Sequence, residues 1–253
     1  MQKQAAGAGN RPGEGQGQMI QDAHIRRTFD EALEAVQARV MKLGGLVETA
    51  LLEAAEALDL RDQALAERVR LGDAAIDALE EEIQTDCARL LALEAPAAGD
   101  LRLVLSVMRI AAALERSGDY AKNLAKRTLV LLNMPQVGTA GGAVRRMAKA
   151  VVAMLTDALD AYVARDAARA GEVRLRDHEI DQLYNALFRE FLTYMMEDPR
   201  NITACMHLHF IAKNIERVGD HATGIAEQVI YLVSGQMPDA ARPKMDSTGA
   251  TTG

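Results

Sequence analysis

The stretch LERSGDYA at residues 114–121 recurs as IERVGDHA at residues 215–222, an offset of 101 residues. In both copies a Glu-Arg-x-Gly-Asp core lies among apolar residues at helical spacing. The likeness continues through Leu-Ala at residues 124–125 and Ile-Ala at residues 225–226. A helical motif that appears twice in one chain predicts a fold made by duplication of one unit.

A pair of aspartates upstream of this motif is repeated as well. Asp73 and Asp77 recur as Asp177 and Asp181, at an offset of 104 residues. The register therefore slips by three residues between the aspartates and the motif, across one loop in each half. A difference in loop length explains the slip, so the duplicated unit includes the helices on both sides of that loop.

Breaks in the helical pattern divide the chain into six helices, the first beginning near Ile25. The breaks are residues 59–62, 96–99, 133–142, 164–166 and 198–199, which contain the prolines, glycines and aspartates typical of turns. The break at 59–62 includes Asp62, which recurs as Asp166 at the offset of 104. Ala, Leu, Glu and Arg dominate a chain with only 4% aromatic residues, which also favours helices.

We therefore predict an all-α fold of two tandem three-helix bundles, at residues 19–134 and 143–235, joined by a linker at 135–142. The two ends of the chain, 1–18 and 236–253, are rich in glycine, proline and polar residues. Such segments cannot bury a core, so disordered tails are expected there.

Charge and composition exclude several classes of protein. The net charge of −7 over 253 residues argues against binding of the nucleic-acid backbone, which needs clustered Lys and Arg. No apolar run reaches the roughly 18 residues of a membrane span, and the N-terminus lacks the apolar region of a signal peptide. Cys87 and Cys205 form no Cys-x-x-Cys pair and are interpreted as buried thiols. A cytoplasmic protein is expected.

Eight carboxylates are the candidate metal ligands. In each half, two of them come from each of two successive helices, and the members of a pair are four residues apart, on one helix face. They are Asp73, Asp77, Glu115 and Asp119 in the first half and Asp177, Asp181, Glu216 and Asp220 in the second.

Each half can place its four carboxylates at one height along a helical hairpin. In the first half, a hairpin folded at the proline of its predicted turn, residue 96, brings Asp77 level with Glu115 and Asp73 level with Asp119. The second half has the same symmetry about its own turn, at residues 198–199. Equal height does not by itself make the four side chains point at one another.

Clustered carboxylates repel one another and need a positive counter-charge. Arg116 and Arg217 are expected to supply part of it, and a cation would supply more. All-oxygen ligands suit hard or borderline ions such as Mg, Mn, Ca or iron. The alternative is a solvated helix face with ordinary ion pairs, but the appearance of the same set twice favours a metal site.

Gly118 and Gly219 lie inside predicted helices beside these acids. Glycine in a helix costs about 1 kcal/mol relative to alanine. Its presence in both copies indicates a close approach of two helices there, or else simple inheritance from the ancestral unit.

These residues resemble the PhoU family of phosphate-signalling proteins, over about residues 24–235. The resemblance rests on the motifs at 115–119 and 216–220, on the aspartate pairs, and on the turn from Pro96 to Asp100-Leu101-Arg102. It implies two three-helix bundles packed side by side, with Fe, Mn, Zn or Mg bound on the acidic motifs. The second half departs from the pattern, since Gly224 replaces Asn123 and Asn201-Ile202-Thr203 replaces the Asp-Leu-Arg turn.

The resemblance also implies a function without catalysis. Such a protein is a negative regulator of the Pho regulon that links the ATPase subunit of the Pst phosphate transporter to the sensor histidine kinase of the Pho system. We expect a homodimer that reaches the membrane only through these partners and binds no nucleic acid.

A carboxylate-bridged metal-storage or redox helical bundle is the alternative. It is favoured by the clustered acids alone. The chain has no Glu-x-x-His, which ferritin-like di-iron bundles use, no GxSxG nucleophile motif and no HExxH zinc motif.

Overall fold

The computed structural model describes residues 14–93 and 98–238, and within these ranges the chain forms six α-helices, one short 3₁₀ helix and no strand. The all-α prediction is confirmed. The elements are α1 (Glu14–Leu60), α2 (Gln63–Leu93), α3 (Ala98–Leu131), α4 (Ala140–Ala164), α5 (Ala167–Glu197), η1 (Pro199–Asn201) and α6 (Ile202–Ser234).

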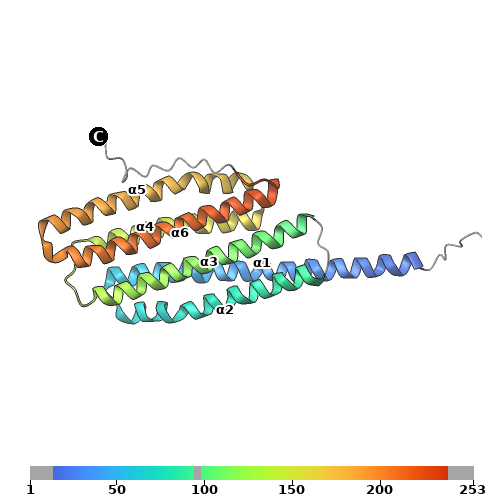
Figure 1. Cartoon of the computed structure of the whole chain (residues 1–253), viewed down its shortest axis with the longest axis horizontal. Coiled ribbons are helices and arrows are strands. Elements are labelled where there is room, and N and C mark those ends of the chain that lie inside the picture. The colour runs from blue at the N-terminus through green and yellow to red at the C-terminus, as the bar shows by residue number, and fades with distance from the viewer. Residues whose placement is uncertain (1–13, 94–97, 239–253) are drawn as a thin grey trace, which may run out of the picture.

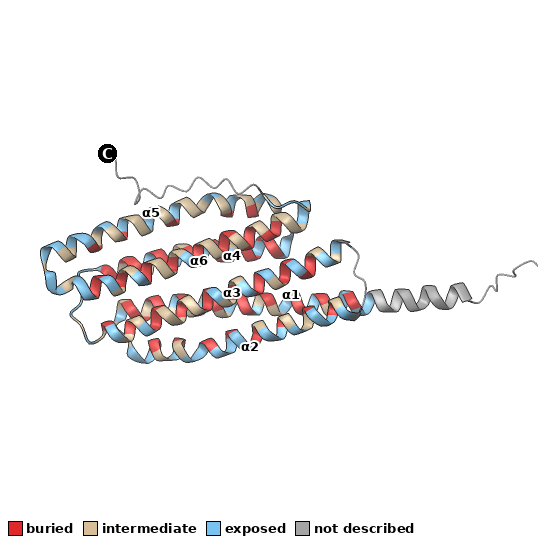
Figure 2. Ribbon diagram, viewed as in Figure 1, coloured by how far each residue is buried: buried red, intermediate tan, exposed pale blue. Residues whose placement is uncertain are grey.

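The helices form two three-helix groups that share one core. Helices α1, α2 and α3 pack together, as do α4, α5 and α6, and the groups meet where α1 packs on α4 and α3 on α6 (Figure 1). Buried residues concentrate on these four central helices, while α2 and α5 lie on the outside (Figure 2). Each group therefore completes its core only against the other.

Two predicted boundaries were wrong. Helix α1 begins at Glu14 rather than near Ile25 and so enters the segment 1–18 that was expected to be a tail. The Glu and Gln residues at 14–18 are adequate helix formers. Helix α4 begins at Ala140, inside the expected linker 135–142. A Cβ atom on Gly141 would lie 3.0 Å from Asp59 Cα, so this glycine serves close packing of α4 on α1.

Other predicted segments fall partly outside the described residues. These are 1–13 of the first tail, 96–97 of the break at 96–99, including Pro96, and 239–253 of the last tail. The breaks at 59–62, 164–166 and 198–199 each separate two helices, and both cysteines are buried free thiols, as predicted.

The turns α1–α2 and α4–α5 repeat the same backbone geometry. Arg61 and Arg165 both have positive φ, of 55° and 51°, and lie 104 residues apart. Each is followed by an aspartate that caps the next helix. Asp62 accepts a hydrogen bond from the Leu65 N–H at 3.0 Å, and Asp166 accepts two from the first turn of α5. The duplication therefore extends to backbone conformation.

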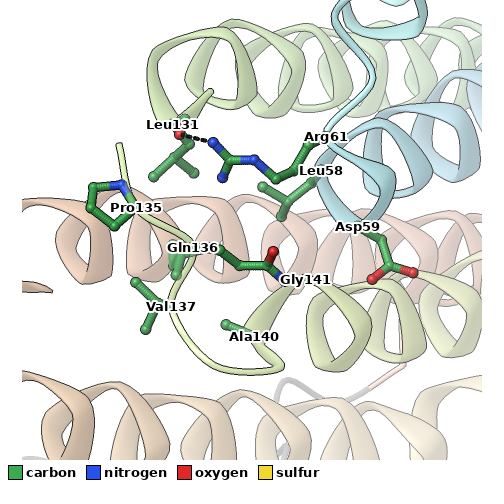
Figure 3. Close-up of a pocket in the computed structure, with 10 residues that line it drawn as sticks. Leu58, Asp59, Arg61, Leu131, Pro135, Gln136, Val137, Ala140 and Gly141 are labelled. Carbon is green, nitrogen blue, oxygen red and sulfur yellow. Dashed lines mark hydrogen bonds between the residues drawn. The ribbon is translucent and has the colours of Figure 1, made fainter. Parts of the chain in front are cut away.

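Arg61 also fixes the connection between the two halves. Its Nη2 donates hydrogen bonds to the carbonyl oxygens of Leu131, Leu132 and Met134 at 3.2, 2.8 and 3.0 Å. Figure 3 shows the guanidinium reaching Leu131 beside Pro135. The adjoining pocket holds only about 30 Å³, room for about one water. This region therefore fixes the chain path rather than binding a ligand.

No described helix is long and apolar enough to span a bilayer.

Candidate functional site

The candidate carboxylates lie on two helical hairpins, α2–α3 and α5–α6, held together at the predicted glycines. A Cβ atom on Gly118 would lie 3.0 Å from two side-chain carbons of Ile76, and one on Gly219 would lie 3.3 Å from Ile180 Cγ2. Ile76 and Ile180 are themselves repeat counterparts, 104 residues apart. The predicted close approach is confirmed, and the same contact aligns the two helices of each hairpin.

In the first half, Asp73 of α2 and Asp119 of α3 are brought together by a lysine. Lys122 donates a hydrogen bond to Asp73 Oδ2 and another, of 3.0 Å, to Asp119 Oδ1. These hydrogen bonds raise the pKa of Lys122, so it stays charged. Asp73 is only 5% exposed, and its Oδ1 has no hydrogen-bond partner among the described residues. The two acids are level, as the hairpin symmetry predicted.

Asp77 and Glu115 complete the first acidic group. Burial raises the pKa of both carboxyls, and repulsion from neighbouring acids raises it further. The neighbours include Asp119 for each of them, and also Glu80, a fifth carboxylate that we did not predict. Glu80 lies three residues after Asp77, on the same helix face, so the spacing rule that found the pairs could have found it.

In the second half, Glu216 is largely enclosed, with a side chain only 13% exposed. Its pKa is raised by burial and by the charges of Asp220 and Asp181, against the lowering effect of Lys213. Lys213 Nζ donates to Glu216 Oε1 at 2.7 Å. Glu216 Oε2 is buried and has no hydrogen-bond partner in the described part of the chain.

Asp177 of the second half has a different hydrogen-bond partner from its counterpart in the first half, Asp73. Asp177 Oδ1 accepts a hydrogen bond from Thr223 Oγ1 at 3.2 Å. Thr223 is the repeat counterpart of Lys122, at the offset of 101. The two acidic groups therefore have carboxylates at corresponding positions, but the lysine that neutralises them lies at a different position in each.

Of the two arginines expected to supply part of the counter-charge, Arg116 does so: its Nε lies 3.7 Å from Glu115 Oε2, and its charge lowers the pKa of that carboxyl. Arg217 instead lies over the ring of Tyr120, 5.7 Å from its centroid. Lys122 and Lys213, which were not predicted, also neutralise acids of the two groups. Each lies three residues from an acid of its own helix, the i,i+3 spacing that the sequence already contained.

A metal ion would have to compete with these lysines. Among the residues whose side chains the structure describes, 27–92 and 99–238, no three His, Cys, Asp or Glu side chains are close enough together to hold a metal ion. The donor chemistry nevertheless fits a hard cation, because each group has one buried carboxylate oxygen without a partner, Asp73 Oδ1 and Glu216 Oε2. A metal ion would bind here only if a lysine moved away and the acids drew closer together.

The two acidic groups are related through the contact between α3 and α6. Tyr120 stacks on His221 with ring centroids 5.8 Å apart and planes at 25°. These residues occupy the same place in the two copies of the motif. Burial lowers the pKa of His221, so the ring is neutral and stacks without a charge.

The chain matches proteins of one family along both halves. The PhoU domain description matches residues 40–128 and 144–229. A phosphate-specific transport system accessory protein PhoU homolog of Caulobacter vibrioides is 44% identical over 223 residues, which cover 88% of this chain and 97% of that protein. The homolog from Rhizobium meliloti is also 44% identical, over 89% of this chain and 95% of its own length.

Solved structures of PhoU proteins also match the chain. The crystal structure of PhoU from Pseudomonas aeruginosa matches with a TM-score of 0.79 and 40% identity, over 82% of this chain and 100% of that one. The phosphate transport system regulatory protein PhoU from Streptococcus pneumoniae matches with a TM-score of 0.77 and 33% identity, over 83% and 99%.

Proposed function

Because this chain belongs to the PhoU family, we propose that it is an accessory protein of phosphate-specific transport and a regulator of phosphate-responsive signalling. The observation that carries the proposal is the match of both halves, at 44% identity, along nearly the whole length of relatives that bear this name. The duplicated acidic motifs lie inside the matched ranges.

We propose that the protein acts by contact, without catalysis, as a negative regulator of the Pho regulon. Its partners would be the cytoplasmic part of the Pho sensor histidine kinase and the ATPase subunit of the Pst transporter, with the protein itself a homodimer in the cytoplasm. The long outer helices α2 and α5 support this, because each offers an exposed helix face on which a partner domain can bind (Figure 2).

Deletion of the gene tests the regulatory role. Alkaline-phosphatase-type output should rise in phosphate-rich medium and return to its low level when the gene is restored. A pull-down with the tagged protein should recover the kinase and the ATPase. If output stays low in the deletion strain and neither partner is recovered, the proposed function is wrong.

We propose further that Fe, Mn, Zn or Mg binds the acidic groups. Asp73, Asp77, Glu115 and Asp119 would hold it in the first half. Asp177, Asp181, Glu216 and Asp220 would do so in the second. The metal would supply positive charge that relieves the repulsion between the acids, and the carboxyl groups whose pKa is raised by burial and by one another support this role.

Mass action provides the test, since a cation that binds only the folded chain must stabilise it. Mn²⁺ should raise the melting temperature. Glu115→Ala/Asp119→Ala should abolish the contribution of the first group, and Glu216→Ala/Asp220→Ala that of the second. Equal stabilisation of both variants and the native chain would contradict these ligands, and rapid stoichiometric oxidation of Fe²⁺ would favour a redox bundle instead.

A further inference from the structure

A groove of about 570 Å³ between α3 and α6 carries a concentration of positive charge. Its lining includes Lys126 and Arg127 from α3, and Lys213 and Arg217 from α6. No carboxylate lines this groove, all of whose lining lies in the described part of the chain. In a chain with net charge −7, such a local excess of cations points to an anionic ligand.

Three of these cations have no acidic partner. Lys213 is paired with Glu216 at 2.7 Å. Lys126, Arg127 and Arg217 form no salt bridge with any residue that the structure describes. The groove therefore presents about three uncompensated positive charges at neutral pH.

Aromatic rings hold the two arginines in place. The Arg127 guanidinium carbon lies 4.5 Å from the centroid of Phe210, and its Nη1 is 3.3 Å from His207 Nδ1. Arg217 lies 5.7 Å from the centroid of Tyr120. A guanidinium supported on an aromatic face loses less freedom when it binds an anion, and it still offers its edge for paired hydrogen bonds.

The second copy of the same helix pair provides an internal comparison. At the offset of 101 residues, the positions of Lys126 and Arg127 correspond to Glu227 and Gln228, and that of Lys213 corresponds to Ala112. Arg109 Nη1 donates to Gln228 Oε1 at 3.4 Å, so an arginine–glutamine hydrogen bond stands where Arg127 meets Phe210. Arg217 has a counterpart in Arg116, but packing of the two helices does not require a cation at 126, 127 or 213.

We propose that this groove binds a polyanion that carries two or more phosphate groups and is of nucleotide size. A phosphate monoester carries about −1.5 to −2 charges at neutral pH, so about two phosphates balance three uncompensated cations. The volume lies in the range of about 300–1,000 Å³ that is usual for small-molecule sites. The inference rests on charge and geometry and does not depend on the role in phosphate signalling.

Calorimetric titration of the full chain in EDTA tests the proposal with ATP, tripolyphosphate and orthophosphate as probes. ATP and tripolyphosphate should bind at least tenfold more tightly than orthophosphate. Lys126→Glu/Arg127→Gln, which gives the groove the residues of the second copy, should weaken both polyanions at least tenfold. Arg217→Gln should weaken them as well, and circular dichroism should show unchanged helix content.

The matched control is Arg146→Gln/Lys149→Glu on α4, which changes the net charge by the same amount at two exposed positions. It should leave binding within about twofold of the native chain. Tighter binding of ATP than of tripolyphosphate would identify a nucleotide, and equal binding would identify a phosphate chain alone. The proposal is overturned if neither polyanion binds more tightly than orthophosphate, or if both double variants weaken binding equally.

Discussion

Replacement of Lys122 by methionine should destabilise the chain and strengthen its response to metal. Lys122 is 25% exposed, and it donates to Asp73, whose side chain is 6% exposed, and to Asp119, which is 41% exposed. Loss of one partner of a fully buried ion pair costs about 3–5 kcal/mol. Water still solvates Lys122 and Asp119 in part, so about 2–3 kcal/mol is expected, nearly all of it from Asp73.

Urea unfolding at pH 7 in EDTA measures this cost. Lys126→Met is the matched control, because Lys126 lies one turn further along α3, is exposed and forms no salt bridge with a described residue. The control should stay within about 0.5 kcal/mol of the native chain. Mn²⁺ should then bind Lys122→Met more tightly than the native chain, by about tenfold or more, because the competing charge is gone.

Two results would refute this reasoning. If Lys122→Met and Lys126→Met unfold at the same urea concentration as the native chain, Lys122 does not compensate a buried acid. If Mn²⁺ stabilises Lys122→Met no more than the native chain, lysine and metal do not compete for these oxygens.

Five further substitutions, two matched pairs and one single change, test the turns, the helix contacts and the acidic group. Arg165→Gly should stabilise the chain by about 0.5–1 kcal/mol, because glycine adopts a positive φ without strain. Arg61→Gly should instead destabilise it by about 1–2 kcal/mol, because the hydrogen bonds to three carbonyls are lost. Equal urea midpoints for the two variants would contradict this. Gly118→Ala should lower the free energy of unfolding by about 1 kcal/mol, whereas Gly219→Ala, with its looser contact, should leave it nearly unchanged in the same assay. The reverse order would show that the helices do not pack most tightly at Gly118. Glu115→Gln in EDTA should stabilise at pH 7. Burial raises the pKa of this carboxyl, so the native chain gains stability as pH falls towards that pKa and the difference should shrink; a constant difference from pH 7 to 4 would contradict it.

Patterns among neighbouring residues predicted the helices, and counting from the turn of a hairpin predicted which acids lie level with one another. Asp62, Asp166 and Pro199 end or start helices through effects that depend on a few neighbouring residues, so they could be found in the sequence. The pairing of Asp73 with Asp119 followed from counting along a hairpin. The sequence did not predict the contacts of side chains whose partners lie on another helix.

Lys122 and Lys213 illustrate the limit. Their side chains are long, and spacing alone does not say whether each turns to an acid of its own helix, to the neighbouring helix or to solvent. The groove beside Arg127 depends on the packing of α3 against α6, and no pattern within either helix specified that contact. Helix α1 begins at Glu14, so helix propensity outweighed the two glycines that follow. The composition of the segment had suggested that these glycines would prevent a helix.

The stacking of Tyr120 on His221 bears on how the chain arose. A residue meets its own copy only on a two-fold axis, so these rings mark the place where two identical subunits would have touched. A half of this chain, cut at the 131–140 connection, exposes the apolar faces that α1 and α3 present to α4 and α6. The arrangement is that of a symmetric dimer of three-helix units whose two subunits are joined in one chain, so each half can differ on its own. Position 122 is a lysine while its counterpart 223 is a threonine, a difference that no symmetric dimer of identical chains can have.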